Sequence, residues 1–293
     1  MLTFGTVLAC VTVVAATLRR RPAIEPPDGV ERHYREADFA AAVAQANSEL
    51  ALLPQSANLD TATQAKNEVI ARRLSLALVG SGLSLEELRA LSLVKPDRQI
   101  RWWTTYILED NRWADYFAER LSRAYVGTDE GPFLVFRRRK FRMWLADHLR
   151  EETPYDQIVR TMLSSEGLWT DTPQVNFVTS TLDEDQRCDP IRLAGRTSRA
   201  FLAQRIDCLQ CHDDFLGELN FGTEEDTIDG VQQHFHELAA FFSGAALADP
   251  VFQGVRDDDE PYQFMYLGES EEETVEPQVP FAQHLLPTEG KPR

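Results

Sequence analysis

The 293-residue chain lacks most of the features that assign a protein quickly to a class. It has only four cysteines, which excludes a small scaffold stabilised mainly by disulfides. A single apolar run approaches the length of a membrane span, so a polytopic membrane protein is excluded. There is no G-x-S-x-G, no H-E-x-x-H and no glycine-rich phosphate loop, so no complete catalytic constellation is visible and enzyme activity stays open.

Basic residues are scarce in the second half of the chain. The formal net charge is −17, divided into +3 for residues 1–150 and −20 for residues 151–293. An acidic chain without a concentrated basic face binds nucleic acid poorly, because neutralising phosphates requires lysine and arginine. We therefore expect no nucleic-acid partner.

Sustained alternation of apolar and polar residues is also nearly absent, so the sequence predicts a mainly α fold. Residues 175–181 are the one strand candidate, and they could equally form a loop. Signals for the start of a helix stand at Ser84 with Glu87, at Asn111, at Thr153-Pro154 and at Asp189-Pro190. The last of these predicts a helix over residues 189–207.

The N-terminal segment is apolar and without charged side chains through residue 18, and three arginines and Pro22 follow it. We predict that residues 1–21 form a membrane anchor or signal segment and hold the body on the periplasmic or cell-surface side. The three arginines leave the orientation open, because the positive-inside rule read literally places the body in the cytoplasm.

Composition divides the rest of the chain into three parts. Residues 22–65 are predicted to form a linker and an N-terminal helix, and residues 66–250 a multi-helix globular domain. Residues 251–293 are rich in acidic residues, with proline and glycine among them, and are predicted to form an irregular acidic linker or tail.

One motif carries recognisable chemistry. Cys208-Leu209-Gln210-Cys211-His212 is a C-x-x-C-H pentapeptide, the attachment pattern of c-type haem. Two thiols three positions apart in one turn can form thioethers to the two porphyrin vinyl groups, and the following histidine can supply the proximal nitrogen to iron. We therefore predict a covalently bound haem c at Cys208, Cys211 and His212, at the end of the helix over residues 189–207.

Other uses of the two thiols stay open. A C-x-x-C pair also suits a redox dithiol, a structural disulfide or half of a zinc site. A thioredoxin-like dithiol should begin a helix in a βαβ context, which is not visible here. Zinc would need two more ligands, which Cys188 and His234 could supply at a spacing unlike that of a compact finger. The alternative function is therefore a helical interaction or scaffold domain with zinc or with no cofactor.

A sixth iron ligand is harder to place. The helix expected around residues 231–242 has an apolar inner face, and His234 lies at the edge of that face while His236 points nearly opposite. His234 is therefore the better distal candidate, although a packed histidine and a five-coordinate iron both stay open. Met265 is the only methionine after the motif and lies in the irregular acidic region.

Several stretches together resemble the planctomycete cytochrome-associated, PSCyt-type domain of unknown function. The resemblance covers about residues 66–247 and is carried by residues 72–91, 112–125, 141–163 with the Pro-Tyr-Asp-Gln run at Pro154, 201–213 and 238–244. The family pattern carries over onto Cys208, Cys211 and His212. It usually has a second histidine two positions after the first, where this chain has Asp214, and the Lys-Phe-Asp-Pro run that follows is lost.

The resemblance implies a helical domain of large exported or surface proteins that carries C-x-x-C-H and precedes a second domain. Residues 285–290 look like the lead-in to that domain. We therefore expect a module that exchanges electrons with a redox partner protein or with a missing C-terminal domain.

Overall fold

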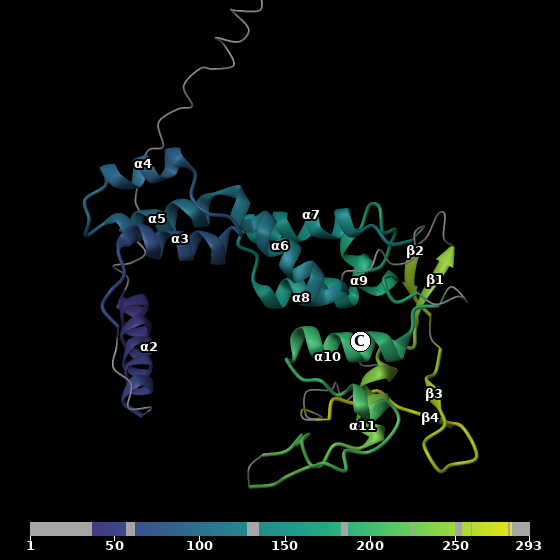
Figure 1. Cartoon of the computed structure of the whole chain (residues 1–293). Coiled ribbons are helices and arrows are strands. Elements are labelled where there is room, and N and C mark those ends of the chain that lie inside the picture. The colour runs from purple at the N-terminus through teal and green to yellow at the C-terminus, as the bar shows by residue number, and fades with distance from the viewer. Residues whose placement is uncertain are drawn as a thin grey trace, which may run out of the picture. The chain divides into compact units, whose positions relative to one another are not determined.

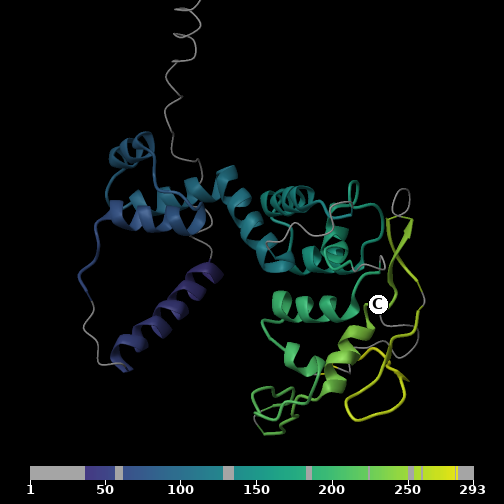
Figure 2. The ribbon, with the colours of Figure 1, turned by 45° about the vertical axis from the view of Figure 1, so that its right-hand side comes forward.

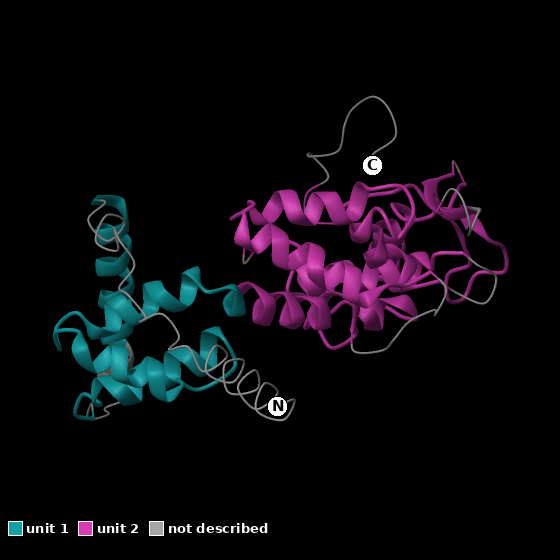
Figure 3. Cartoon of the chain, turned by 90° about the horizontal axis from the view of Figure 1, so that it is seen from above, with its two compact units in different colours: residues 1–113 teal, residues 114–293 magenta. Residues whose placement is uncertain are grey.

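The structure, a computed structural model, describes residues 37–56, 62–127, 135–182, 187–223, 225–249, 254–258, 260–280 and 282. These residues form a mainly helical fold, as predicted. The chain divides into two compact units, residues 1–113 and residues 114–293, so the division falls inside the helical domain expected over 66–250 (Figure 3). The predicted anchor, residues 1–21, lies outside the described residues, and none of the described helices is long and apolar enough to span a membrane.

The first unit is built from short helices packed through α5. Its elements are α2 (Ala37–Ser56), α3 (Asn67–Leu78), α4 (Leu85–Leu93), α5 (Gln99–Glu109) and the first turn of α6 (Asn111–Val126). Trp102, Trp103 and Ile107 of α5 are buried against Ala71 of α3 and Leu91 of α4. Burial of these aromatic rings removes apolar surface from water and so stabilises this small core.

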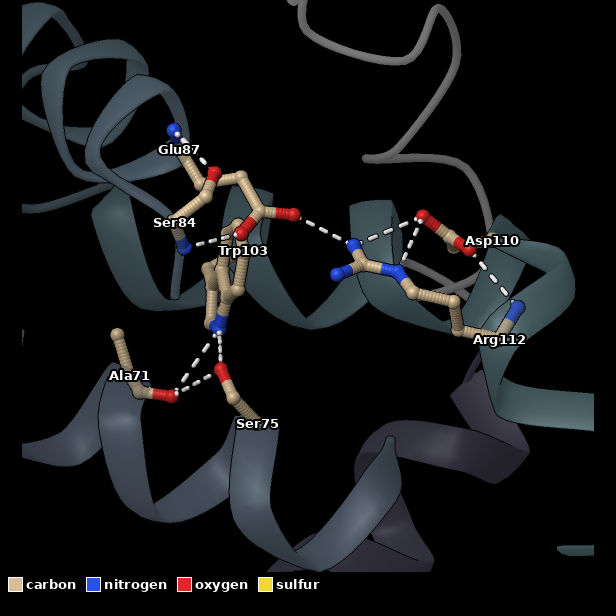
Figure 4. Close-up of polar contacts among 7 residues, drawn as sticks. All are labelled: Ala71, Ser75, Ser84, Glu87, Trp103, Asp110 and Arg112. Carbon is tan, nitrogen blue, oxygen red and sulfur yellow. Dashed lines mark hydrogen bonds and ion pairs between the residues drawn. The ribbon is translucent and has the colours of Figure 1, made fainter. Parts of the chain in front are cut away.

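A network of hydrogen bonds and ion pairs also joins the helices of the first unit (Figure 4). The predicted capping box is confirmed, since the Ser84 hydroxyl accepts from the Glu87 amide and the Glu87 carboxylate accepts from the Ser84 amide. The buried Glu87 also pairs with Arg112, whose guanidinium binds Asp110. Asp110, rather than the predicted Asn111, caps α6 by accepting the Arg112 amide at 2.8 Å.

The second unit contains the remaining helices and all described strands (Figure 1). The helices after α6 are α7 (Arg138–Arg150), α8 (Tyr155–Ser164), the 3₁₀ turn η2 (Pro173–Val175), α9 (Asn176–Thr179), α10 (Pro190–Phe201), the 3₁₀ turn η3 (Asp207–Gln210) and α11 (Gln232–Ala240). Two antiparallel pairs join β1 (Ala245–Asp249) to β2 (Gly254–Asp257) and β3 (Gln263–Phe264) to β4 (Glu273–Thr274). One apolar core unites these elements, and α10 packs beside α11 within it (Figure 1).

The strand candidate at residues 175–181 was wrong, because this segment is helical in η2 and α9. The Asn176 side chain explains the local bend: it donates to the carbonyls of Trp169 and Pro173 and accepts the Arg137 amide. These bonds satisfy backbone polar groups in a segment that is buried on nearly every side. In such a segment the alternation of apolar and polar residues does not distinguish a strand from a helix.

The helix expected over 189–207 begins as predicted but ends early. Asp189 caps α10 by accepting from the next two amides after Pro190, and the helix stops at Phe201. Ala203 then adopts a left-handed conformation with φ of 54°, which redirects the chain before η3. The motif therefore lies on a separate 3₁₀ turn and not on the end of a long helix.

The described part of residues 251–293 is not an irregular tail. It contributes β2, β3 and β4, and the Val275 amide donates to the Tyr262 carbonyl. Tyr262, Phe264 and Tyr266 surround the ring of His236 on α11. The segment runs beside α11 (Figure 2), so aromatic packing outweighs the acidic composition that indicated a linker.

Candidate functional site

The C-x-x-C-H turn is fixed to the rest of the second unit by two residues, one inside the motif and one just before it. Leu209, between the two cysteines, is 0% exposed and packs in the apolar core of the second unit. Asp207, at the start of η3, forms an ion pair with Arg199 of α10. One buried side chain and one ion pair therefore fix the turn against α10, whose start is set by the Asp189 cap.

The two thiols lie on the outer side of this turn. Cys208 and Cys211 are both exposed and both free. The Cys211 amide donates to the Cys208 carbonyl at 3.3 Å, which closes one 3₁₀ turn. Positions three apart follow one another on the same side of a 3₁₀ turn, which is the spacing of the two cysteines.

His212 follows the turn with one ring nitrogen engaged. Its Nδ1 atom lies 2.7 Å from the carbonyl oxygen of Asp213. A carbonyl oxygen only accepts, so Nδ1 donates and Nε2 of the neutral ring keeps its lone pair. This is the arrangement typical of metal-binding histidines, in which the second nitrogen is held by a backbone carbonyl.

Apolar side chains lie exposed directly beside His212. Phe215 is 78% exposed and its ring lies 5.1 Å from the His212 ring, and Leu216 is 70% exposed. Single exposed apolar residues are ordinary, but these two are adjacent and stand next to two exposed thiols. The surface beside the motif therefore offers apolar contact to a flat ligand.

Side chains of α11 form hydrogen bonds with the backbone of the motif turn. The carbonyl of Gln210 accepts from Nε2 of His236 at 3.1 Å and from Nε2 of Gln232 at 2.9 Å. The backbone amide of Gln232 donates to the Asp213 carboxylate at 2.7 Å, which supplies the cap that Val231 cannot give to α11. The middle of the motif, at Gln210, and the residue that follows it, Asp213, are thus bonded to the first turns of one helix.

His236, expected nearly opposite the apolar inner face of its helix, is nevertheless buried. Its side chain is 0% exposed, and its ring stacks on Phe264 with centroids 3.4 Å apart. Since Nε2 donates to Gln210, Nδ1 accepts the Tyr262 hydroxyl at 2.8 Å. Burial lowers the pKa of His236, against a smaller opposing effect of the Gln210 carbonyl, so the ring is neutral at pH 7.

His234, the candidate for the distal ligand, has a structural contact of its own. The Val231 amide donates to its Nδ1 at 3.2 Å, so in the neutral ring Nε2 carries the proton. Its ring meets Phe221 edge-on, and burial lowers its pKa against a smaller opposing effect of Asp213. In this tautomer His234 stabilises the start of α11 and presents no lone pair at Nε2. Met265 is about half exposed just after β3.

Asp214 stands where the family usually has a second histidine, and its carboxylate accepts hydrogen bonds from the loop that follows. Asp214 accepts from the amides of Leu219 at 2.6 Å and Leu216 at 3.1 Å. The Leu219 amide is the largest of several backbone donors that hold the pKa of Asp214 below its usual range. Asp214 therefore stabilises the loop after the motif.

A family model named PSCyt2, described as a protein of unknown function (DUF1549), matches residues 51–245. The chain belongs to this family. The match includes the motif turn and α11, and it ends at the first residue of β1. No curated protein and no solved structure matches the chain.

In this DUF1549 chain the described His, Cys, Asp and Glu side chains include no group of three or more arranged to hold a metal ion. Cys188, which was considered as a zinc ligand, is buried, whereas Cys208 and Cys211 are exposed. The residues that sequence reasoning missed are Gln232 and His236, which act on the backbone of the motif. The alternation of Tyr262, Phe264 and Tyr266 was the signal that could have indicated a covering segment over α11.

Proposed function

We propose that this DUF1549 chain is a c-type cytochrome-like module that binds haem covalently and transfers electrons. Cys208 and Cys211 would form the two thioethers, and Nε2 of His212 would ligate the iron. The observation that carries the proposal is the hydrogen bond from His212 Nδ1 to the Asp213 carbonyl, which leaves Nε2 as a lone-pair donor beside two free thiols.

The residues present fit the group. Two free, exposed thiols three positions apart and one oriented imidazole are the donor set that c-type attachment requires. A bound haem would supply a one-electron iron couple. The hydrogen bonds from Gln232 and His236 to the Gln210 carbonyl would hold the thiols and the imidazole in a fixed arrangement. Phe215 and Leu216 would shield part of the macrocycle from water.

The proposal also sets the surroundings of the module. Covalent haem attachment occurs outside the cytoplasm, so the body would be periplasmic or on the cell surface. The apolar N-terminal segment, residues 1–18, would attach it to the membrane. Electrons would pass to a redox partner protein or to a further C-terminal domain, and the acidic surface would favour a basic partner.

The test is production of the full chain with the c-type maturation machinery, followed by a pyridine haemochrome spectrum and haem staining after denaturation. We expect stain that survives denaturation, its loss when both Cys208→Ala and Cys211→Ala are introduced, and a matched control variant, Cys188→Ala, that stains like the parent. His212→Ala should keep some covalent haem but shift its absorption bands. A properly exported chain without colour would overturn the proposal.

A second candidate rests on the same exposed thiols. Cys208 and Cys211 are free and accessible, so they could form a structural disulfide in a helical interaction or scaffold domain. This interpretation predicts a colourless chain whose mass increases by two hydrogen atoms when a thiol reductant opens the disulfide. Elemental analysis for zinc on the same sample tests the remaining alternative.

A further inference from the structure

A pocket of about 220 Å³ lies between α11 and the segment around β4. His212 does not line it, although Gln233 and Tyr266 also line the neighbouring pocket that contains His212. Its lining comes from α11 and from the segment around β4, namely Gln233, Glu237, Tyr266, Glu273, Thr274, Val275, Glu276 and Gln278. The Gln278 amide donates to the Glu237 carbonyl at 3.2 Å and so ties this segment to the helix. The pocket is therefore built by contacts within the second unit.

A buried acid in this wall has no partner for one of its oxygens. Glu237 is 5% exposed, and its Oε2 atom makes no hydrogen bond with any described residue. A buried carboxylate oxygen without a partner costs free energy, so such an atom is usually satisfied by something. Burial raises the pKa of Glu237, against a smaller opposing hydrogen bond from Gln233.

A second orphaned atom lines the same pocket. The hydroxyl of Tyr266 is buried and also has no partner among the described residues. Burial first, and then the carboxylates of Glu273 and Glu237, raise the pKa of Tyr266 to about 12. The hydroxyl therefore stays protonated and can both accept from a ligand and donate to a carboxylate.

The charge of the lining selects the class of ligand. Three carboxylates, those of Glu237, Glu273 and Glu276, line the pocket and no lysine, arginine or histidine does. The described acidic residues do not converge into a group that could hold a metal ion. Separated carboxylates and a hydroxyl instead suit a cation with several N–H donors pointing in different directions.

We propose that this pocket binds an organic cation bearing N–H donors, either an alkylammonium or a guanidinium group. A cavity of about 150 Å³ is large enough for benzene, so the available volume takes a group of this size. Glu237 would accept an N–H hydrogen bond from the ligand at its unpartnered Oε2, and Tyr266 would accept one at its hydroxyl. The exposed carboxylates of Glu273 and Glu276 would add negative charge around the cation.

The experiment is calorimetric titration of the full chain at low salt with n-propylammonium and with methylguanidinium chloride. Tetramethylammonium chloride, which has no N–H donor, serves as the comparison at equal ionic strength. We expect saturable binding of at least one of the first two ions, and at least ten-fold weaker binding of tetramethylammonium. Equal binding of all three ions, or no saturable binding, would overturn the proposal.

Two isosteric variants locate the site. Glu237→Gln should weaken binding at least ten-fold and Tyr266→Phe a few-fold, with melting curves recorded to verify folding. Glu272→Gln is the matched control, because Glu272 is exposed in the same segment and does not line the pocket. An effect of Glu272→Gln as large as that of Glu237→Gln would mean attraction by net charge alone and would overturn the site.

A last titration distinguishes the source of the cation. Nα-acetyl-lysine N-methylamide presents the ammonium as a polypeptide side chain would. Binding at least as tight as that of n-propylammonium identifies a basic side chain of a partner chain as the occupant. Ten-fold weaker binding identifies a small free amine instead.

Discussion

Nε2 of His236 donates a hydrogen bond of 3.1 Å to the carbonyl of Gln210, which stands between the two exposed thiols. The other nitrogen of the same ring accepts from the Tyr262 hydroxyl at 2.8 Å. A continuous chain of hydrogen bonds therefore joins the segment before β3 to the C-x-x-C-H turn through a fully buried ring. The hydrogen bonding behind the motif therefore extends to Tyr262, which lies beyond the match to the family.

The first prediction concerns this ring. His236→Phe keeps an aromatic ring of similar size but removes both hydrogen bonds, leaving Tyr262 without its acceptor. We expect a loss of about 1–3 kcal/mol in the free energy of unfolding, because two buried polar groups lose a partner. Urea unfolding of both proteins gives the difference from the midpoints.

The control for this prediction is Tyr262→Phe, which removes one of the two bonds and should cost about 1 kcal/mol. The two changes should also be non-additive in the double variant, because they break the same chain of bonds. Equal midpoints for the parent and His236→Phe would show that the ring does not hold the turn.

The second prediction is a loss of stability in mild acid. Burial lowers the pKa of both His234 and His236 in the folded chain. Between these lowered values and the unfolded value of about 6.5, the unfolded chain binds more protons. The free energy of unfolding should therefore fall as the pH drops below about 6.5, and stop falling from this cause below the folded pKa values. Each unit of lowering is worth about 1.4 kcal/mol.

The variants isolate the contribution of His236. Glu237 has the opposite effect on stability. Because its pKa is raised in the folded chain, the folded chain binds more protons than the unfolded chain, and this contribution increases the free energy of unfolding as the pH falls. The difference in unfolding midpoint between pH 7.5 and pH 5.5 should therefore be compared between the parent and His236→Phe. A difference of the same size in both proteins would contradict the assignment.

Local signals predicted the starts of two helices correctly, where a side chain bonds the backbone a few residues away. The capping box of Ser84 and Glu87 and the start at Asp189 depend on neighbours within three residues, so the sequence contains everything they need. The left-handed turn at Ala203 was not predictable in this way, because alanine carries no preference for positive φ.

The burial of His236 was missed for a different reason. A helical wheel assigns one inner face, but α11 packs on the motif turn on one side and on Tyr262 and Phe264 on another. A short helix enclosed in this way is buried on more than one face, and polar residues such as His236 on its second face become part of the core. The donor atoms of the candidate site were thus predicted, but the residues that hold them were not.

The third prediction concerns the first unit, where Arg112 bonds the buried Glu87 (Figure 4). Arg112→Met leaves that carboxylate without its charged partner. It also removes the guanidinium donors that, together with the retained Arg112 backbone amide and against the effect of burial, hold the pKa of Asp110 below its usual range. We expect a loss of about 1–2 kcal/mol, since the arginine is partly exposed and water can replace some of the contact.

Arg73→Met is the matched control, because Arg73 is exposed on α3 of the same unit and should change stability by less than about 0.5 kcal/mol. Glu87→Gln combined with Arg112→Met should cost less than the sum of the single changes. Additive effects would mean that the two side chains do not stabilise each other.

The last prediction is a stabilising change next to the motif. Ala203 is exposed and has φ of 54°, a conformation that costs a residue with a Cβ atom about 1–2 kcal/mol. Ala203→Gly removes this cost but gives the unfolded chain more freedom, so the expected net gain is about 0.5–1 kcal/mol. Ala200→Gly, three residues earlier inside α10, should instead cost about 1 kcal/mol, because its backbone is helical. Opposite signs for the two substitutions in urea unfolding would confirm the left-handed turn that separates α10 from the thiols, and equal losses would contradict it.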